Sequence, residues 1–213
     1  MKTLEARLCE GRQYRNFDVS QFERRAEDDG EKIVEGYATT FNQPYELFRD
    51  GNYIVMEQVD PAAFDECDMS DVIMQYNHEG RVFARTNNGT LGLEADMKGL
   101  HIRANLCGTE IGRQLYEEIE GGYTDKMSFG FRVGEDKRET TENFEDNTVT
   151  IMRTITKISK LYDVSAVSIP ANDATSISAR SFGEGVIDEV KKEFLAREAR
   201  ERQIRKIKIL MEV

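Results

Sequence analysis

Three residues of this chain carry the side chains that nucleophilic catalysis needs. Ser128 could act as the nucleophile, His78 as the general base and Asp163 as the acid that orients the base. The chain has 213 residues and only two histidines, so any chemistry that needs an imidazole must use His78 or His101. The spacing alone does not bring the three residues together, and a single histidine is usually an ordinary surface or core residue.

The sequence around Ser128 and Asp163 limits the kind of site that they could form. No glycine stands two residues before Ser128 in the segment KMSFGFRV at 126–133, which argues against the nucleophile turn of the α/β-hydrolases. Asp163 lies in an apolar segment that also contains Leu161 and Val167. A carboxylate in such surroundings needs a partner, because burying an unpaired charge is costly.

The other reactive side chains offer weaker sites. His101 falls in a predicted hairpin strand and is expected to be structural, and the neighbours of Cys107 offer no base. The three cysteines are widely spaced without a CxxC pair, so a zinc ribbon or a thioredoxin-type site is not expected. Two histidines are too few for a histidine-rich metal centre. We therefore predict no metal and no cofactor, with reduced and mostly buried cysteines.

The sequence does not single out donors for an oxyanion. Backbone N–H groups near Gly121 and Gly122 are candidates, and Arg85 or Arg132 could act through water. For both arginines, a surface ion pair is the more common role in an acidic protein.

Charge and hydropathy argue against two classes of function. The chain has 40 acidic and 29 basic residues, which gives a net charge of −11. Such a surface repels phosphates, so non-specific nucleic-acid binding is not expected. No apolar run is long enough to cross a bilayer, and the N-terminal segment lacks the apolar core of a signal peptide. We predict a soluble, intracellular protein without a membrane or nucleic-acid partner.

β-Strand patterns dominate the first 170 residues. Strands are expected at 33–41, 53–59, 72–78, 90–95, 100–106, 126–133, 149–158 and 161–169. By its period of two, the third of these should carry His78 at its end, on the face of Met74 and Tyr76. The strand at 126–133 should be half-buried, with its large apolar residues on one face and with Ser128 and Gly130 on the other.

Helices are expected in three places. Asp60 and Pro61 should begin a short helical turn, and apolar residues at every fourth position predict a helix over 109–119. From Ile187 onward the chain predicts one long charged helix. Its partial apolar stripe fails at Arg197 and Glu201, which does not support a sustained coiled coil. A solvated helix and an arm that binds a partner or a second subunit are equally consistent with this pattern.

These elements predict an α+β fold, with a mainly antiparallel β-barrel or sandwich and peripheral helices. We divide the chain into a polar N-terminal segment at 1–30, a β-barrel domain at 31–180 and a charged C-terminal helix at 181–213. The highly charged segment 134–148 is expected to form an exposed hairpin tip or loop.

An ordered series of short motifs resembles the prohead protease family of tailed bacteriophages. The resemblance spans about residues 33–172, and it is the order and spacing of the motifs that make it specific. The motifs are Glu35-Gly36-Tyr37-Ala38 with Phe41-Asn42; Pro61-Ala62-Ala63-Phe64; Asn77-His78-Glu79; Gly89-Thr90-Leu91 with Asp96 and Gly99-Leu100; Ser128-Phe129-Gly130-Phe131; and Asp163-Val164-Ser165 with Pro170-Ala171.

The resemblance implies a role for each of the three candidate residues. It makes His78 the base, Ser128 the nucleophile and Asp163 the third member. This chain has Asp163 where glutamate is the more familiar form, which shortens the reach to the imidazole by one methylene. The family is similar in fold to the herpesvirus assembly proteases, which implies a β-barrel ringed by a few helices.

The resemblance also implies a function and its setting. It implies a serine endopeptidase that cleaves the scaffold and the major capsid protein precursor within the assembling prohead, in the host cytoplasm. A homodimer follows only by analogy with the herpesvirus enzymes. The alternative is a catalytically silent structural or scaffolding component of the prohead with a C-terminal docking helix.

Overall fold

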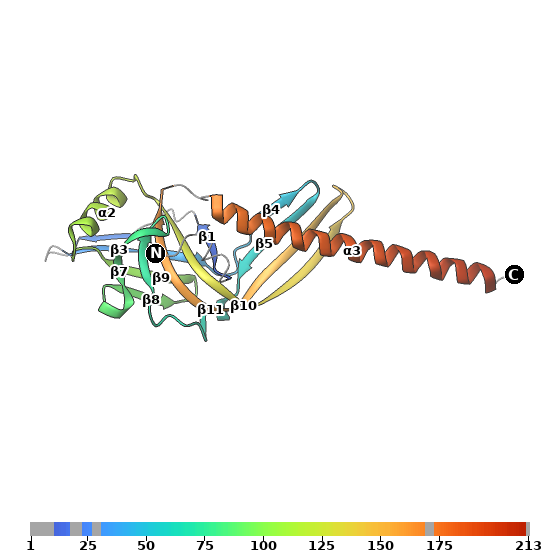
Figure 1. The fold of residues 1–213 in the computed structure, drawn as a ribbon, viewed down its shortest axis with the longest axis horizontal. Coiled ribbons are helices and arrows are strands. Elements are labelled where there is room, and N and C mark those ends of the chain that lie inside the picture. Colours follow the sequence, from blue (N-terminus) through green and yellow to red (C-terminus); the bar gives the residue numbers. More distant parts are fainter. Residues whose placement is uncertain (1–10, 18–22, 27–30, 169–172, 212–213) are drawn as a thin grey trace.

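Two β-sheets and a long C-terminal helix make up most of the computed structural model, which describes residues 11–17, 23–26, 31–168 and 173–211 (Figure 1). The strands are β1 (Gln13–Phe17), β2 (Glu23–Ala26), β3 (Lys32–Thr40), β4 (Tyr45–Asp50), β5 (Tyr53–Val59), β6 (Ile73–Tyr76), β7 (Glu79–Arg85), β8 (Leu91–Ala95), β9 (Gly99–Asn105), β10 (Lys126–Asn143) and β11 (Thr148–Val167). The helices are the 3₁₀ turns η1 (Pro61–Phe64) and η2 (Thr86–Asn88), and the α-helices α2 (Glu110–Glu120) and α3 (Asp173–Met211).

The larger sheet has seven strands and branches. Its main path runs β1-β10-β11-β5-β4, and the β6–β7 hairpin joins it through β11. β11 is parallel to β5 along its first half and parallel to β6 along its second half, while the other pairs in this sheet are antiparallel. The smaller sheet has the order β2-β3-β9-β8 and is antiparallel throughout.

The predicted α+β class is confirmed, but the barrel is not. Among the described strands, neither hydrogen-bonded sheet closes on itself. β11 pairs with β5 at one end and with β6 at the other, so the larger sheet branches instead of closing into a barrel. An isolated parallel bridge between Phe41 and Val59 connects the two sheets, and a common apolar core that includes Ile102, Phe129 and Leu161 lies between them.

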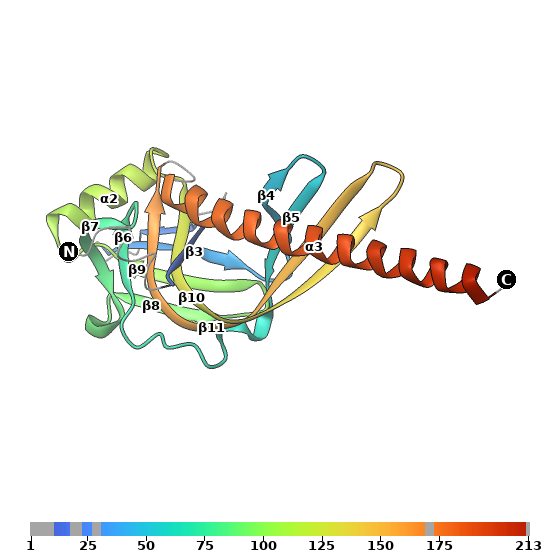
Figure 2. The same ribbon diagram turned by 45° about the vertical axis from the view of Figure 1, so that its right-hand side comes forward.

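β10 and β11 form one long curved hairpin that carries much of the molecule (Figure 2). Two strands were expected at 149–158 and 161–169, but β11 is continuous from Thr148 to Val167, and Ile169 lies outside the described residues. The pairing of β10 with β11 shows register shifts between Gly130 and Asp136 of β10, and such bulges curve a strand without ending it. Most of the charged segment 134–148 therefore extends the two strands, and the hairpin tip is at 144–147.

The short helices agree with their sequence signals. Asp60 caps η1 by accepting a hydrogen bond from the Ala62 N–H, and Thr109 caps α2 by accepting one from the Gly112 N–H. The predicted strand pair at 90–95 and 100–106 is confirmed as β8 and β9.

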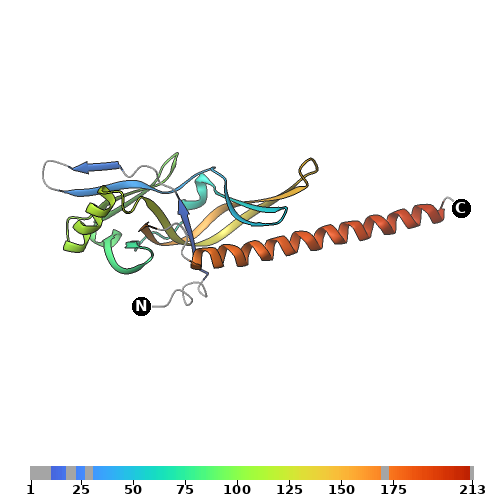
Figure 3. The ribbon, with the colours of Figure 1, turned by 90° about the horizontal axis from the view of Figure 1, so that it is seen from above.

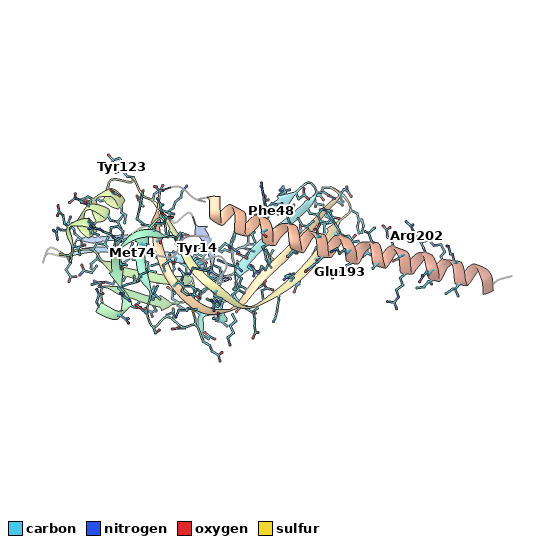
Figure 4. All side chains as sticks on the ribbon, viewed as in Figure 1. Tyr14, Phe48, Met74, Tyr123, Glu193 and Arg202 are labelled. Atoms are coloured by element: carbon cyan, nitrogen blue, oxygen red, sulfur yellow. The ribbon has the colours of Figure 1, made fainter. Side chains whose placement is uncertain are left out.

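Helix α3 begins at Asp173, which is earlier than the predicted start at Ile187. Gly183 and Gly185 lie inside the helix, although glycine usually disfavours one. Gly183 packs against Phe48 of β4, where a Cβ atom would lie 2.3 Å from the ring, so the helix approaches the sheet closely at this point (Figure 4).

The second half of α3 extends beyond the sheets (Figure 3). Its first half contributes Val186, Ile187 and Val190 to a second apolar cluster with β5 and β11. No helix in the described part of the chain is both long enough and apolar enough to span a membrane.

Candidate active site

Asp163, His78 and Ser128 form one hydrogen-bonded line. His78 Nε2 lies 2.5 Å from Ser128 Oγ, and His78 Nδ1 is hydrogen-bonded to Asp163 Oδ1. An ionised carboxylate can only accept a hydrogen bond, so the imidazole proton belongs on Nδ1. Nε2 is then left to accept the proton of the serine hydroxyl.

A two-residue turn holds His78 in place. Tyr76 of β6 pairs with Glu79 of β7, so Asn77 and His78 are the turn residues. Both have left-handed backbones, with φ of 48° and 60°, as a type I′ turn requires. Asn and His adopt this conformation more readily than most residues. The prediction that His78 ends a strand is therefore wrong, because the strand stops at Tyr76.

Strand pairing brings this turn to the other two residues. The Asn77 N–H donates to the Ala166 carbonyl over 3.0 Å, which anchors the turn on β11. In the antiparallel pair of β10 and β11, Ser128 lies opposite Ser165 and Gly130 lies opposite Asp163. The three side chains therefore come from two neighbouring strands and from a turn fixed to one of them.

Ser165 is a fourth polar member of the site. Its Oγ donates to Asp163 Oδ1 over 3.1 Å and lies 3.2 Å from His78 Nδ1. The side chain is fully buried. Ser165 therefore fixes the carboxylate in the orientation that serves the imidazole.

Because Gly130 has no side chain, there is room beside it for the Asp163 carboxylate. A Cβ atom at this position would lie 2.3 Å from Asp163 Oδ2 and 2.8 Å from Tyr14 Cε1. Both distances are shorter than atoms can approach, so the site requires the absence of a side chain here.

The hydrogen-bonded line is closed off from solvent. The exposed fractions of Ser128, His78 and Asp163 are 0%, 3% and 1%. Strand β1 lies along β10 with Asn16 opposite Ser128, and the Tyr14 ring centroid is 4.4 Å from that of His78. The prediction of a half-buried strand is therefore wrong at Ser128, because the Tyr14 and His78 side chains cover the face that was expected to be polar.

The electrostatics favour an ionised Asp163. Burial alone would raise the pKa of this carboxyl, but the charge and hydrogen bond of His78 oppose the effect. With further contributions from Arg12 and Ser165, they hold its pKa below the ordinary value. A negative Asp163 can orient the neutral imidazole and stabilise the imidazolium that forms when His78 takes a proton. The arrangement has the parts needed for acyl transfer by a serine.

Comparison with known families identifies the chain at this point. The sequence model of the caudovirus prohead serine protease family matches residues 20–193. The chain belongs to this family. The solved structure of the bacteriophage T4 capsid assembly protease gp21 is similar over 73% of this chain and 96% of that chain, with 10% sequence identity and a TM-score of 0.40. A search of curated proteins found no match.

The other residues of this prohead protease that the sequence offered as catalytic or oxyanion-binding candidates make different contacts. His101 stacks edge-on against Tyr37 in the smaller sheet, with ring centroids 5.2 Å apart. Arg85 forms the expected surface ion pair, with Asp71 at 2.6 Å. Cys67 and Cys107 are half-buried rather than buried, and burial raises the pKa of the Cys67 thiol to about 11, which disfavours a thiolate.

Two contributors to the site were not assigned a role from the sequence. The motifs of this prohead protease include Ser165 and Gly130, but only the register of β10 and β11 gives their purpose. A small residue opposite a buried acid is a weak signal, because local patterns do not specify which strands pair.

Proposed function

We propose that this chain is a serine endopeptidase that cleaves the scaffold and the major capsid protein precursor within the assembling prohead, in the host cytoplasm. The observation that carries the proposal is the hydrogen-bonded line from Asp163 through His78 to Ser128. Membership of the prohead protease family supports the peptidase activity.

The reaction begins with acylation of Ser128. His78 Nε2 takes the hydroxyl proton as Ser128 Oγ attacks the scissile carbonyl carbon, which gives a tetrahedral oxyanion. The oxyanion collapses as His78 gives its proton to the leaving amine, and an acyl-enzyme remains. Asp163 keeps the imidazole in the required tautomer and balances its positive charge in both steps.

Deacylation repeats the same proton transfers with water. His78 takes a proton from the attacking water, and the ester to Ser128 breaks as the hydroxyl is restored. General-base catalysis of this kind contributes about 10²–10⁴-fold to the rate.

Two substitutions test this function directly. We expect Ser128→Ala and His78→Ala to abolish cleavage of purified scaffold and capsid precursor. The thermal unfolding midpoint of Ser128→Ala should stay close to that of the parent, whereas that of His78→Ala should fall, because the buried Asp163 carboxylate loses its partner. A serine-directed fluorophosphonate should label the parent and not Ser128→Ala. Full cleavage by both variants would contradict the proposal. A parent that stays unlabelled and inactive even when strand β1 no longer covers Ser128 would favour a structural role in the prohead.

The dependence of the rate on pH provides a second test. A histidine can act as a general base only in its neutral form, so kcat/KM should fall on acidification while the protein stays folded. A rate that does not fall on acidification would argue against a histidine base. Sedimentation of the same preparation would show whether the active species is a homodimer.

A further inference from the structure

Strand β1 lies beside Ser128, the proposed nucleophile, in a position that a substrate polypeptide could also occupy. Among the described strands it is the outermost one of the larger sheet and pairs with β10 alone, with Arg15 opposite Phe129 and Asn16 opposite Ser128. The carbonyl oxygen of Arg15 accepts a hydrogen bond from Ser128 Oγ over 2.8 Å. An extended segment of this chain therefore presents a peptide carbonyl directly to the proposed nucleophile.

The observed contact is not a reactive one. The Ser128 hydroxyl has a single proton, so it cannot donate to Arg15 and to His78 Nε2 at the same time. The carbonyl accepts through its oxygen, whereas attack requires the carbonyl carbon to face Oγ. Strand β1 thus occupies the site in the manner of an inhibitor.

The Arg15 side chain is anchored in a polar cluster, which we call the Glu57 cluster (Gln13, Arg15, Tyr45, Glu57, Asp136 and Arg153). Its central members Arg15, Glu57 and Arg153 are buried, and the other three are half-buried. The Arg15 guanidinium donates to both carboxylate oxygens of Glu57, at 2.5 Å and 3.0 Å, and to Gln13 Oε1 at 2.8 Å. Glu57 is fully buried, and it also accepts from Tyr45 and from Arg153 Nη1, the latter at 2.6 Å. The pairing of Arg15 with Glu57 is bidentate, a geometry that favours a guanidinium group.

The Glu57 carboxylate depends on the Arg15 guanidinium, because its other partners are shared or uncharged. Arg153 pairs with Asp136 at 2.6 Å as well as with Glu57, and Asp136 also pairs with the more exposed Arg138 at 3.6 Å. Without Arg15, the fully buried Glu57 carboxylate keeps the shared guanidinium of Arg153 and the Tyr45 hydroxyl and loses its bidentate partner. Loss of such a partner from a buried carboxylate is strongly unfavourable, so displacement of β1 creates a position that favours a new cation.

We propose that polypeptide substrates bind to the edge of β10 in place of β1, with a lysine or arginine side chain paired to Glu57 and its own carbonyl at Ser128. Cleavage should then follow a basic residue. This inference rests on the proposed serine peptidase activity and adds its specificity. Main-chain hydrogen bonds to an exposed strand edge are a common way to hold extended peptides, and side-chain sites then select among them.

The same geometry makes β1 a competitor of the substrate. Tyr14, the residue before Arg15, packs against the ring of His78, so β1 covers the base as well as the nucleophile. Both must become accessible before a substrate can react. Weakening the hold of Arg15 on Glu57 should therefore make Ser128 more accessible.

Cleavage-site mapping with the full chain tests the specificity without any substitution. A complex peptide library with internal lysines and arginines would be incubated with the parent and with Ser128→Ala, and the new termini identified by mass spectrometry. We expect Ser128-dependent cleavage that follows Lys or Arg. A matched pair of peptides, with arginine or its uncharged analogue citrulline before the cleaved bond, should differ in kcat/KM by about 30-fold or more.

Two variants test the roles of Glu57 and Arg15. Glu57→Gln should reduce the discrimination between arginine and citrulline peptides to a few-fold. Arg15→Ala should increase the rate of fluorophosphonate labelling at Ser128 by about tenfold or more, because it weakens the occupied state. Arg49→Ala is the matched control, because it removes an arginine from the exposed pair with Glu46 on the adjacent strand β4. It should change neither quantity.

The outcomes separate the two proposals. Ser128-dependent cleavage without a preference for basic residues would overturn the inference and leave the serine peptidase intact. Equal labelling of Arg15→Ala and the parent, with both folded, would overturn the role of β1. Cleavage that survives in Ser128→Ala would instead contradict the proposed function. The library measurement on the parent remains decisive if a substitution in the Glu57 cluster prevents folding.

Discussion

At the scale of single residues, Gly130 is tied to the site as closely as the groups proposed to react. Gly130→Ala would place a methyl group 2.3 Å from Asp163 Oδ2. We expect this variant to displace the carboxylate from His78 and to lower kcat by about 10²-fold or more, because misplacement by about 1 Å has effects of this size. Peptide cleavage assays and thermal unfolding would measure the two consequences separately.

Gly185→Ala is the matched control for this prediction. Gly185 is exposed in α3, and a Cβ atom there would meet nothing within 4 Å. This variant should keep full activity and gain about 0.5–1 kcal/mol of stability from its helix propensity. Full activity of Gly130→Ala would contradict the proposed requirement for an empty position beside Asp163.

The lowered pKa of Glu57 predicts that acid reduces the stability of the fold. Burial alone would raise its pKa, but Arg15, Arg153 and Tyr45 lower it from the ordinary 4.5 to about 2. The native state therefore binds fewer protons than the unfolded chain between these values. The stabilisation by Glu57 is complete above about pH 4.5 and is lost as the pH falls toward about 2.

Urea unfolding at several pH values would test this prediction. We expect Glu57→Gln to be less stable than the parent at neutral pH by about 3–5 kcal/mol, because two buried guanidinium groups lose their common partner. The difference should shrink as the pH falls below about 4.5. Glu94→Gln, on an exposed position of β8, should follow the parent at every pH. A constant difference for Glu57→Gln would contradict the prediction.

At the scale of elements, the β6–β7 turn determines where His78, the proposed base, lies. Asn77 and His78 both need a left-handed backbone, which β-branched residues disfavour strongly. We expect Asn77→Val to lose about 1–3 kcal/mol of stability and most activity, and Asn77→Gly to stay close to the parent. Unfolding curves and peptide cleavage would measure both effects. Equal activity of the two variants would show that the turn does not control the position of His78.

At the scale of the whole molecule, α3 has two parts with different surroundings. Ile187 is buried against the larger sheet, whereas Leu195 and Ile207 are 66% and 57% exposed. Arg202 lies on the part that extends beyond the sheets (Figure 4). Ile187→Ala should therefore cost about 2–5 kcal/mol of stability. Removal of residues 199–213 should leave the unfolding midpoint and peptide cleavage unchanged.

The truncated chain also distinguishes the two interpretations of the C-terminal helix. Reduced incorporation into proheads, with peptide cleavage intact, would identify the exposed half of α3 as a docking arm. Unchanged incorporation would identify it as a solvated helix. The cut must lie beyond Phe194, because an earlier one would remove side chains that pack in the second apolar cluster.

Local sequence pattern is enough to predict the types of the side chains proposed to react and most of the elements that carry them. The alternating apolar pattern at 126–133 located the strand of Ser128. The cap at Asp60 and the apolar residues at every fourth position of 109–119 located two helices. These features depend on residues within a few positions of one another, so local pattern is sufficient. The α+β class follows from their order along the chain.

Only the tertiary structure decided which of these groups meet. Ser128 and His78 are 50 positions apart, His78 and Asp163 are 85 apart, and Arg15 and Glu57 are 42 apart. Their contacts depend on strand order, on the parallel pairing of β6 with β11 and on the bulges that bend β10 and β11. A shift of one residue in strand register would turn each side chain to the opposite face. Local pattern does not fix that register, because it is set by the packing of the whole sheet.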